Sequence, residues 1–91
     1  MERRVYKYEL PVDDHVIVEM PTGAKILHVH EQHEKVYLWA LIDPTEVRTQ
    51  KRAFRIAGTG HPIEYTDQFA FIGSVHLREG MFVFHVFEVK H

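Results

Sequence analysis

Apolar and polar residues alternate with a period of two along almost the whole chain, and this pattern constrains the fold more than any other feature. Successive side chains of a β-strand point to opposite faces, so such alternation is typical of strands with one buried face. Apolar residues nowhere recur at the spacing of an amphipathic helix over more than two turns. The sequence therefore predicts a fold built almost wholly of β-strands.

Turn-forming residues divide the alternating segments at intervals of roughly 8–12 residues, as in small sandwiches and barrels. The predicted strands are Arg4–Leu10, His15–Met20, Lys25–Glu31, Val36–Ile42, Lys51–Ala57, Phe69–Leu77 and Met81–Glu88. We expect the first two to form a hairpin through Pro11–Asp14, whose residues favour turns. Thr45–Val47 is expected to form at most one helical turn. The sequence thus predicts an all-β domain of about seven short antiparallel strands, arranged as a small sandwich or a partly open barrel.

The alternation also predicts which strand faces are buried. In the strand of 25–31 we expect Leu27 and Val29 to point into the core, and Ile26, His28 and His30 to point away from it. In the strand of 69–77, Gly73 is expected to mark a β-bulge or a close contact.

Two segments, Tyr37–Ile42 and Phe82–Phe87, are apolar on both faces. A strand of this kind lies at the centre of a sheet or is covered by another subunit. A chain of 91 residues without cysteine has a small core and no disulfide to support it. We therefore expect residues 1–91 to form a single domain that associates with copies of itself.

Charge and composition restrict the partners. The net charge of −2 provides no overall field that would attract nucleic acid or an acidic membrane surface, and there is no apolar run of membrane-spanning length. The absence of cysteine suits a reducing compartment. We expect a cytoplasmic protein, with neither a membrane nor nucleic acid among its partners.

Eight histidines are a high number for this length, and two of them, His28 and His30, stand at the spacing that lets a strand present both to one metal ion. Together with Gly23 and Glu34 they resemble part of the cupin signature, although the gap after Gly23 is one residue short and no second cupin segment follows. We expect the two histidines to lie on a solvated strand face and no metal or other cofactor to be bound. A cupin-like, metal-dependent enzyme is kept as an alternative.

A cluster of basic residues offers a second candidate site. Arg48, Lys51, Arg52 and Arg55 fall in a stretch without acidic residues, and guanidinium groups pair well with phosphate. The aromatic residues alternate into the expected core and are not interleaved with this cluster, as a nucleic-acid stacking surface requires. A solvated strand face is the simpler interpretation.

The loop that follows this cluster is the most site-like segment. Gly58 and Gly60 can let backbone N–H groups approach a ligand, while Thr59 and His61 supply a hydroxyl and an imidazole. With Arg55 they form the predicted ligand-binding set. A tight turn whose glycines serve backbone geometry alone explains the same residues equally well.

Residues for nucleophilic catalysis are few. The chain has no cysteine, and its one serine, Ser74, lies in a predicted strand outside any Gly-x-Ser-x-Gly motif. The carboxylates are scattered over turns and strand ends, so no acid–base pair stands out. We assign no catalytic residues and expect a protein that is not an enzyme.

The chain resembles a family of small uncharacterised proteins of tailed phages and prophages. The resemblance rests on the segments 38–44 (LWALIDP), 52–63 (RAFRIAGTGHPI), 71–75 (FIGSV) and 82–88 (FVFHVFE), and it covers most of the chain. It implies a phage-encoded accessory protein that acts in the host cytoplasm, without an established activity to transfer. In that family the positions of His28, His30 and His33 are not characteristically histidine.

These observations lead to one functional hypothesis and three alternatives. The leading hypothesis is an accessory protein that binds a host factor or a small ligand without catalysis. The alternatives are sequestration of an anionic nucleotide signal of host defence, the cupin-like enzyme, and a minor structural protein of the virion.

Overall fold

A computed structural model of the chain describes residues 2–90, which form seven β-strands and no helix. The strands are β1 (Arg4–Glu9), β2 (His15–Pro21), β3 (Lys25–Gln32), β4 (Lys35–Ile42), β5 (Thr49–Gly58), β6 (Phe69–Leu77) and β7 (Phe82–Val89). The predicted all-β fold is confirmed, and the observed strand ends lie within two residues of the predicted ones. Residues 2–90 contain no helix long and apolar enough to cross a membrane.

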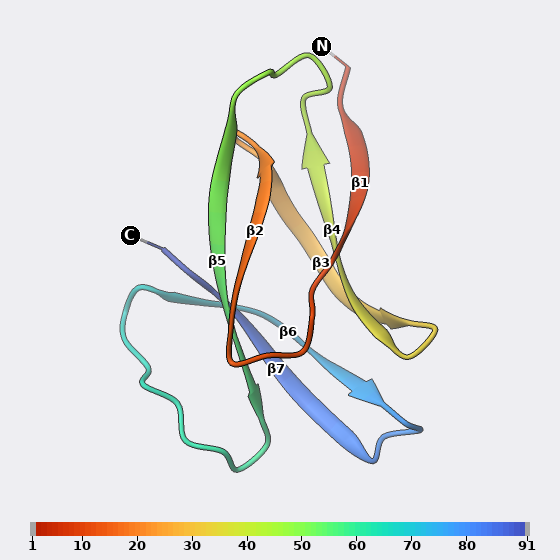
Figure 1. The fold of residues 1–91 in the computed structure, drawn as a ribbon, viewed down its shortest axis with the longest axis vertical. Coiled ribbons are helices and arrows are strands. Elements are labelled where there is room, and N and C mark those ends of the chain that lie inside the picture. The colour runs from red at the N-terminus through yellow and green to blue at the C-terminus, as the bar shows by residue number, and fades with distance from the viewer. Residues whose placement is uncertain (1, 91) are drawn as a thin grey trace.

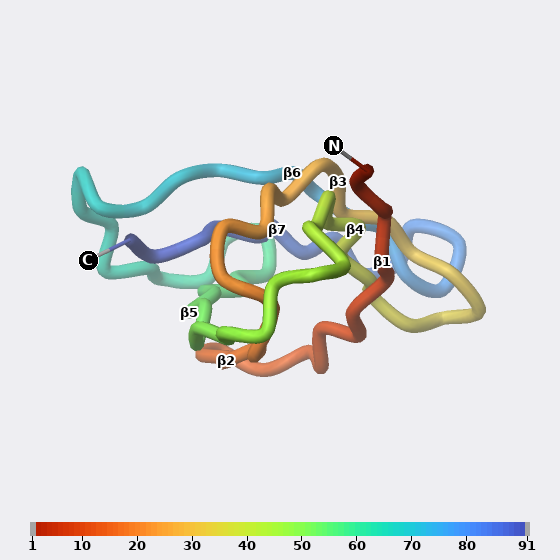
Figure 2. The backbone as a smooth tube through the Cα atoms, turned by 90° about the horizontal axis from the view of Figure 1, so that it is seen from above, coloured from red at the N-terminus to blue at the C-terminus, as the bar shows by residue number. Residues whose placement is uncertain are grey.

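The strands form two antiparallel sheets (Figure 1). One sheet has the order β1-β4-β3 and the other the order β2-β5-β7-β6. The sheets adjoin where β3 packs against β6 (Figure 2), and they do not close into a barrel. The two strands with apolar residues on both faces, β4 and β7, each lie between two neighbours within their sheet, as their composition predicts.

The predicted hairpin of the first two strands is wrong, because β1 and β2 belong to different sheets. β1 pairs with β4, and β2 pairs with β5. Leu10, in the link between them, is buried, and its backbone N–H donates a hydrogen bond to the Val36 carbonyl at 2.8 Å. This anchored residue carries the chain from one sheet to the other, so Pro11–Asp14 bends the chain between sheets and not within one.

The structure has a turn and an irregular stretch where the sequence predicts a helical turn at Thr45–Val47. The Asp43 carboxylate accepts hydrogen bonds from the backbone N–H of Thr45 at 2.9 Å and from its hydroxyl at 2.7 Å. The hydroxyl bond is the largest cause of a lowered pKa of Asp43, followed by the backbone bond. Such local bonds favour a turn over a continuing helix.

One hydrophobic core lies between the sheets. Its buried side chains are Leu10, Val16, Met20, Ala24, Val29, Val36, Leu38, Ala40, Ile42, Phe54, Ile56, Val75 and Val86. Where β3 meets β6, a Cβ atom on Gly73 would lie 2.9 Å from Cγ1 of Val29, so a larger residue there would force Val29 or the strands to shift. The pairing of β6 with β7 also shifts register between Phe71 and Gly73. Both predictions for Gly73, a bulge and a close contact, are confirmed.

A second bulge corrects one of the predicted core residues. The pairing of β3 with β4 shifts register between Ile26 and His28, so the intervening Leu27 has no partner in the ladder. Val29 is buried as predicted, but Leu27 is 45% exposed. Strict alternation places Leu27 on the core face and Ile26 on the outer one. The extra residue of the bulge turns Leu27 outward and packs Ile26 against the core, so both predictions are wrong.

A charged pair lies among the apolar side chains. Arg52 of β5 and Glu88 of β7 join through two hydrogen bonds, and a further N–H of Arg52 donates to the Ala24 carbonyl at 2.7 Å. Glu88 is buried and Arg52 half-buried. Because Ala24 lies at the entry to β3, these contacts tie the four-stranded sheet to the three-stranded one.

Replacing Leu38 by Ala should lower the free energy of unfolding by about 2–5 kcal/mol, because truncating a buried leucine leaves a cavity. Leu27→Ala makes the same chemical change at an exposed position and should cost less than about 0.5 kcal/mol. Urea unfolding of the two variants and the unaltered protein measures both values. Equal losses would contradict the bulge that turns Leu27 outward.

Candidate functional site

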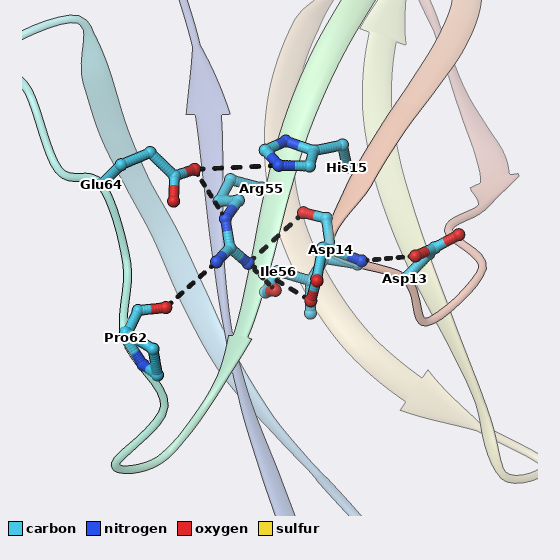
Figure 3. A network of polar contacts seen from close by, with 7 residues as sticks. All are labelled: Asp13, Asp14, His15, Arg55, Ile56, Pro62 and Glu64. Carbon is cyan, nitrogen blue, oxygen red and sulfur yellow. Dashed lines mark hydrogen bonds and ion pairs between the residues drawn. The ribbon is translucent and has the colours of Figure 1, made fainter.

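Arg55 lies at the centre of a network of polar contacts that joins three separate segments (Figure 3). Its side chain, on the face of β5 opposite the core, donates from Nε to Glu64 at 2.9 Å and from Nη2 to the Pro62 carbonyl at 3.2 Å. Nη1 donates to the carbonyls of Asp14, at 3.4 Å, and of Ile56. The guanidinium therefore fixes both the loop that follows β5 and the turn that precedes β2.

The positive charge of Arg55 is already balanced within the chain. Glu64 contacts Nε, and the Asp14 carboxylate lies 3.7 Å from Nη1. The hydrogen bond from Arg55 is the largest cause of a lowered pKa of Glu64. The Arg55 residue is 6% exposed. Arg55 therefore holds the loop in place, and its contact with a ligand remains a prediction.

The predicted loop residues form a tight turn at the end of β5. The His61 N–H donates to the Gly58 carbonyl at 3.0 Å, and Gly60 has a φ of 86° at the third position, which type II turns reserve for glycine. A Cβ on Gly58 would lie 3.0 Å from the His61 ring, so the imidazole covers this backbone. Thr59, between the glycines, is exposed and bonds through its N–H to the Val83 carbonyl at 3.2 Å.

Thr59 also begins a chain of polar side chains across the outer face of the four-stranded sheet. Its hydroxyl oxygen lies 2.7 Å from Nε2 of His85, and Nδ1 of the same ring lies 2.7 Å from the Ser74 hydroxyl. A neutral imidazole has one donor and one acceptor nitrogen, so one hydroxyl donates to the ring and the other accepts from it. The accepting hydroxyl keeps its own proton for a further partner.

The sequence prediction did not include Ser74 or His85. The pairing of these two residues could have been predicted from the hairpin of β6 and β7, in which Leu77 pairs with Phe82 across the turn. Counting outward from that turn places Ser74 opposite His85, and both residues precede the bulge that disrupts the count. The register of this hairpin cannot predict the contact between Thr59 and His85, because that contact depends on the pairing of β5 with the other edge of β7.

Two open hollows meet at His61. One, of about 310 Å³, is lined by Gly58, Thr59, His61, Met81, Phe82, Val83 and Phe84. The other, of about 620 Å³, is lined by Asp14, His15, Arg55, Ala57, His61, Pro62, Ile63 and Glu64. The first hollow is largely apolar, with the Thr59 hydroxyl at its edge. The second is lined by charged side chains of both signs. The structure therefore brings the predicted residues together around His61, which faces both hollows.

The predicted basic cluster is dispersed. Arg48 pairs with Glu46, Arg52 with Glu88 and Arg55 with Glu64, while Lys51 is exposed. The hydrogen bond with Arg48 is the largest cause of a lowered pKa of Glu46, as expected for a paired carboxylate. The three acidic partners lie outside residues 48–55, with Glu46 just before this stretch and Glu64 and Glu88 after it, so the local absence of acids does not produce a basic surface here.

His28 and His30 project from the same face of β3, as predicted. Their rings stack with centroids 5.6 Å apart, and with Trp39 they line an open hollow of about 290 Å³. Within residues 2–90, no group of three or more histidine, aspartate or glutamate side chains is placed to hold a metal ion. The pair alone supplies two of the four ligands of a structural zinc site.

Arg55→Gln should weaken local protection of the loop of residues 60–68 by about 1–3 kcal/mol, because the Pro62 carbonyl and Glu64 lose the charged donor that holds them. Hydrogen exchange read by mass spectrometry measures this opening peptide by peptide. Arg48→Gln, which removes an exposed pair, is the matched control and should leave the loop unchanged. Unaltered exchange of the loop in Arg55→Gln would show that Arg55 does not hold it.

Comparison with known proteins places the chain in a family. Residues 1–91 match the family described as a domain of unknown function, DUF7352. No curated protein and no solved structure matches the chain. Since the match spans the full sequence, the chain belongs to the DUF7352 family.

Proposed function

We propose that this protein is a phage-encoded accessory protein of the host cytoplasm that binds a small ligand or a host factor, without catalysis, at the Gly58–His61 turn. One observation carries the proposal: the Arg55 network and the hydrogen bond to His85 hold Thr59 in place on an exposed surface. A fixed turn loses little conformational entropy on binding. The phage assignment rests on the sequence segments that resemble tailed-phage proteins.

The contacts of His85 favour binding over catalysis. A histidine that acts as a general base is normally oriented by a carboxylate on one nitrogen and activates a nucleophile on the other. Here both ring nitrogens contact neutral hydroxyls, those of Thr59 and Ser74. This arrangement fixes the imidazole and leaves a hydroxyl ready to donate or accept, as a binding site requires.

The surroundings of the turn favour a ligand with an apolar part and a few polar groups. Phe82 and Phe84 line the hollow beside Thr59, and the two rings stack with centroids 6.4 Å apart. On the other side of His61, the charge of Arg55 is balanced by Glu64 and Asp14. Sequestration of an anionic nucleotide is the second candidate, because the imidazoles of His15 and His61 line the same hollow.

The protein should retain its ligand when it is purified from cells that supply it. Heating the purified protein and analysing the released compounds by chromatography and mass spectrometry detects a bound ligand. Thr59→Val keeps the branched shape but removes the hydroxyl, and it should lower the affinity roughly tenfold. Thr49→Val, at an exposed threonine of the same sheet, is the control and should bind normally.

A released nucleotide would support the second candidate, and any other retained compound would support the first. Affinity capture from host extract with the same three proteins tests for a host factor. Equal retention by Thr59→Val and by the unaltered protein would place the site elsewhere. Failure to retain any compound or host protein would contradict the proposal.

Self-association is proposed through the aromatic side chains outside the four-stranded sheet. Tyr65, Phe69, Phe71 and Phe87 form a cluster with ring centroids 5.4–6.1 Å apart. Tyr65 and Phe71 are 62% and 61% exposed. Contiguous exposed aromatic surface is typical of protein interfaces, and a second copy of the chain would cover it.

Phe71→Arg should reduce the mass measured by light scattering to that of a 10.8 kDa monomer, because a charge at the exposed edge of the aromatic cluster, beside Phe87, is desolvated on association. Val47→Arg introduces the same charge at a residue that is 91% exposed and outside the cluster, and it should leave the mass unchanged. A monomeric mass for the unaltered protein at micromolar concentration would contradict self-association.

A further inference from the structure

The outer face of the β1-β4-β3 sheet gathers aromatic and basic side chains from three strands. Register places Lys7 and His28 on either side of Trp39, and Glu9 and His30 on either side of Tyr37. Lys25 and Lys35 lie on the same face near its two ends, beside Leu41 and Gln32. Because these residues are spread over the sequence, no local pattern reveals the surface.

The aromatic rings of this face are available to a flat ligand. His28 and His30 are exposed and stacked, and Trp39 closes the hollow that they line. Tyr37 and Trp39 meet edge to face with centroids 6.1 Å apart. Residues two positions apart on a strand are separated by about 6.6 Å, so the face offers a row of separate stacking positions.

Positive charge accompanies these rings. The Lys7 ammonium lies 4.5 Å from the centre of the Tyr37 ring and donates to Gln32 at 2.8 Å, which holds it over the centre of the sheet. Lys25 and Lys35 are exposed. Among the strand residues on this face, Glu9 is the one acidic side chain. A protein with a net charge of −2 thus has one face that is both basic and aromatic.

We propose that this face binds single-stranded nucleic acid, with bases stacked on Trp39 and on the flanking imidazoles and with phosphates near Lys7 and Lys25. Sheet faces that combine aromatic rings with lysines bind single strands in this way, because every base has a face that can stack. The expectation that nucleic acid is not a partner rested on the net charge and on the cluster of 48–55, which lies along β5 of the other sheet and at the residue before it. The proposal is independent of the Gly58–His61 turn.

The single tryptophan makes the test direct, since Trp39 is the sole source of tryptophan fluorescence. An oligothymidylate of about eight nucleotides should quench this fluorescence with a saturable curve, and its affinity should fall as salt rises from about 50 to 200 mM. Fluorescence anisotropy of the labelled oligonucleotide follows binding by variants that lack tryptophan. Trp39→Leu should weaken binding at least about fivefold, whereas Trp39→Phe should retain most of it.

Charge variants separate this face from the rest of the surface. Lys7→Gln combined with Lys25→Gln should weaken binding and flatten the dependence of log affinity on log salt by about 1.4, corresponding to two lost phosphate contacts. Arg48→Gln combined with Lys51→Gln removes the same charge at the start of β5 and at the residue before it, and it should have little effect. Thermal unfolding of each variant checks that it folds.

Three results would overturn the proposal. They are the absence of both quenching and anisotropy change, equal weakening by the two double variants, and binding of duplex DNA as tightly as of the single strand. Unchanged binding by Thr59→Val is expected, because that residue lies on the other sheet.

Discussion

Two small sheets share one core, and they can do so because β3 and β6 approach closely at Val29 and Gly73. Neither a three-stranded nor a four-stranded sheet of this size could bury one face by itself. The contact joins the sheets along one side, and Arg52 joins them again through Glu88 and the Ala24 carbonyl. These two connections fix the two sheets, and the surface features that each sheet carries, relative to one another.

Arginine side chains act here as structural cross-links between backbone segments. Arg52 works between the sheets and Arg55 outside them, and each combines a carboxylate with backbone carbonyls. The planar guanidinium suits this task, because its donors point in several fixed directions. A buried ion pair adds little net stability, since desolvation offsets its attraction. The arginine contacts instead fix the positions of backbone segments. They hold the residues that surround His61 in place, which a small core alone would not do.

Period-two alternation was enough to locate all seven strands, because six of them bury one face against the core and the seventh, β1, packs Tyr8 against it. It failed at Leu27, since a bulge adds a residue without any mark in the sequence. It also could not pair β1 with β4 or β2 with β5, because a turn of Pro and Asp bends a chain equally well within a sheet or between sheets. Residues of the candidate site were found where they adjoin in sequence, as in 58–61, and missed where register brings them together, as with Ser74 and His85.

The strand order has a consequence for synthesis. β3 and β4 form one hairpin and β6 and β7 another, whereas β1 and β2 pair with strands much farther along the chain. Local hairpins form quickly, and pairings that close long loops form late. β1 and β2 therefore leave the ribosome before their partners have been made. Both must wait as unpaired strands, and the charged residues Arg4, Lys7, Glu9 and Glu19 along them are the kind that protects open strands from pairing with another chain.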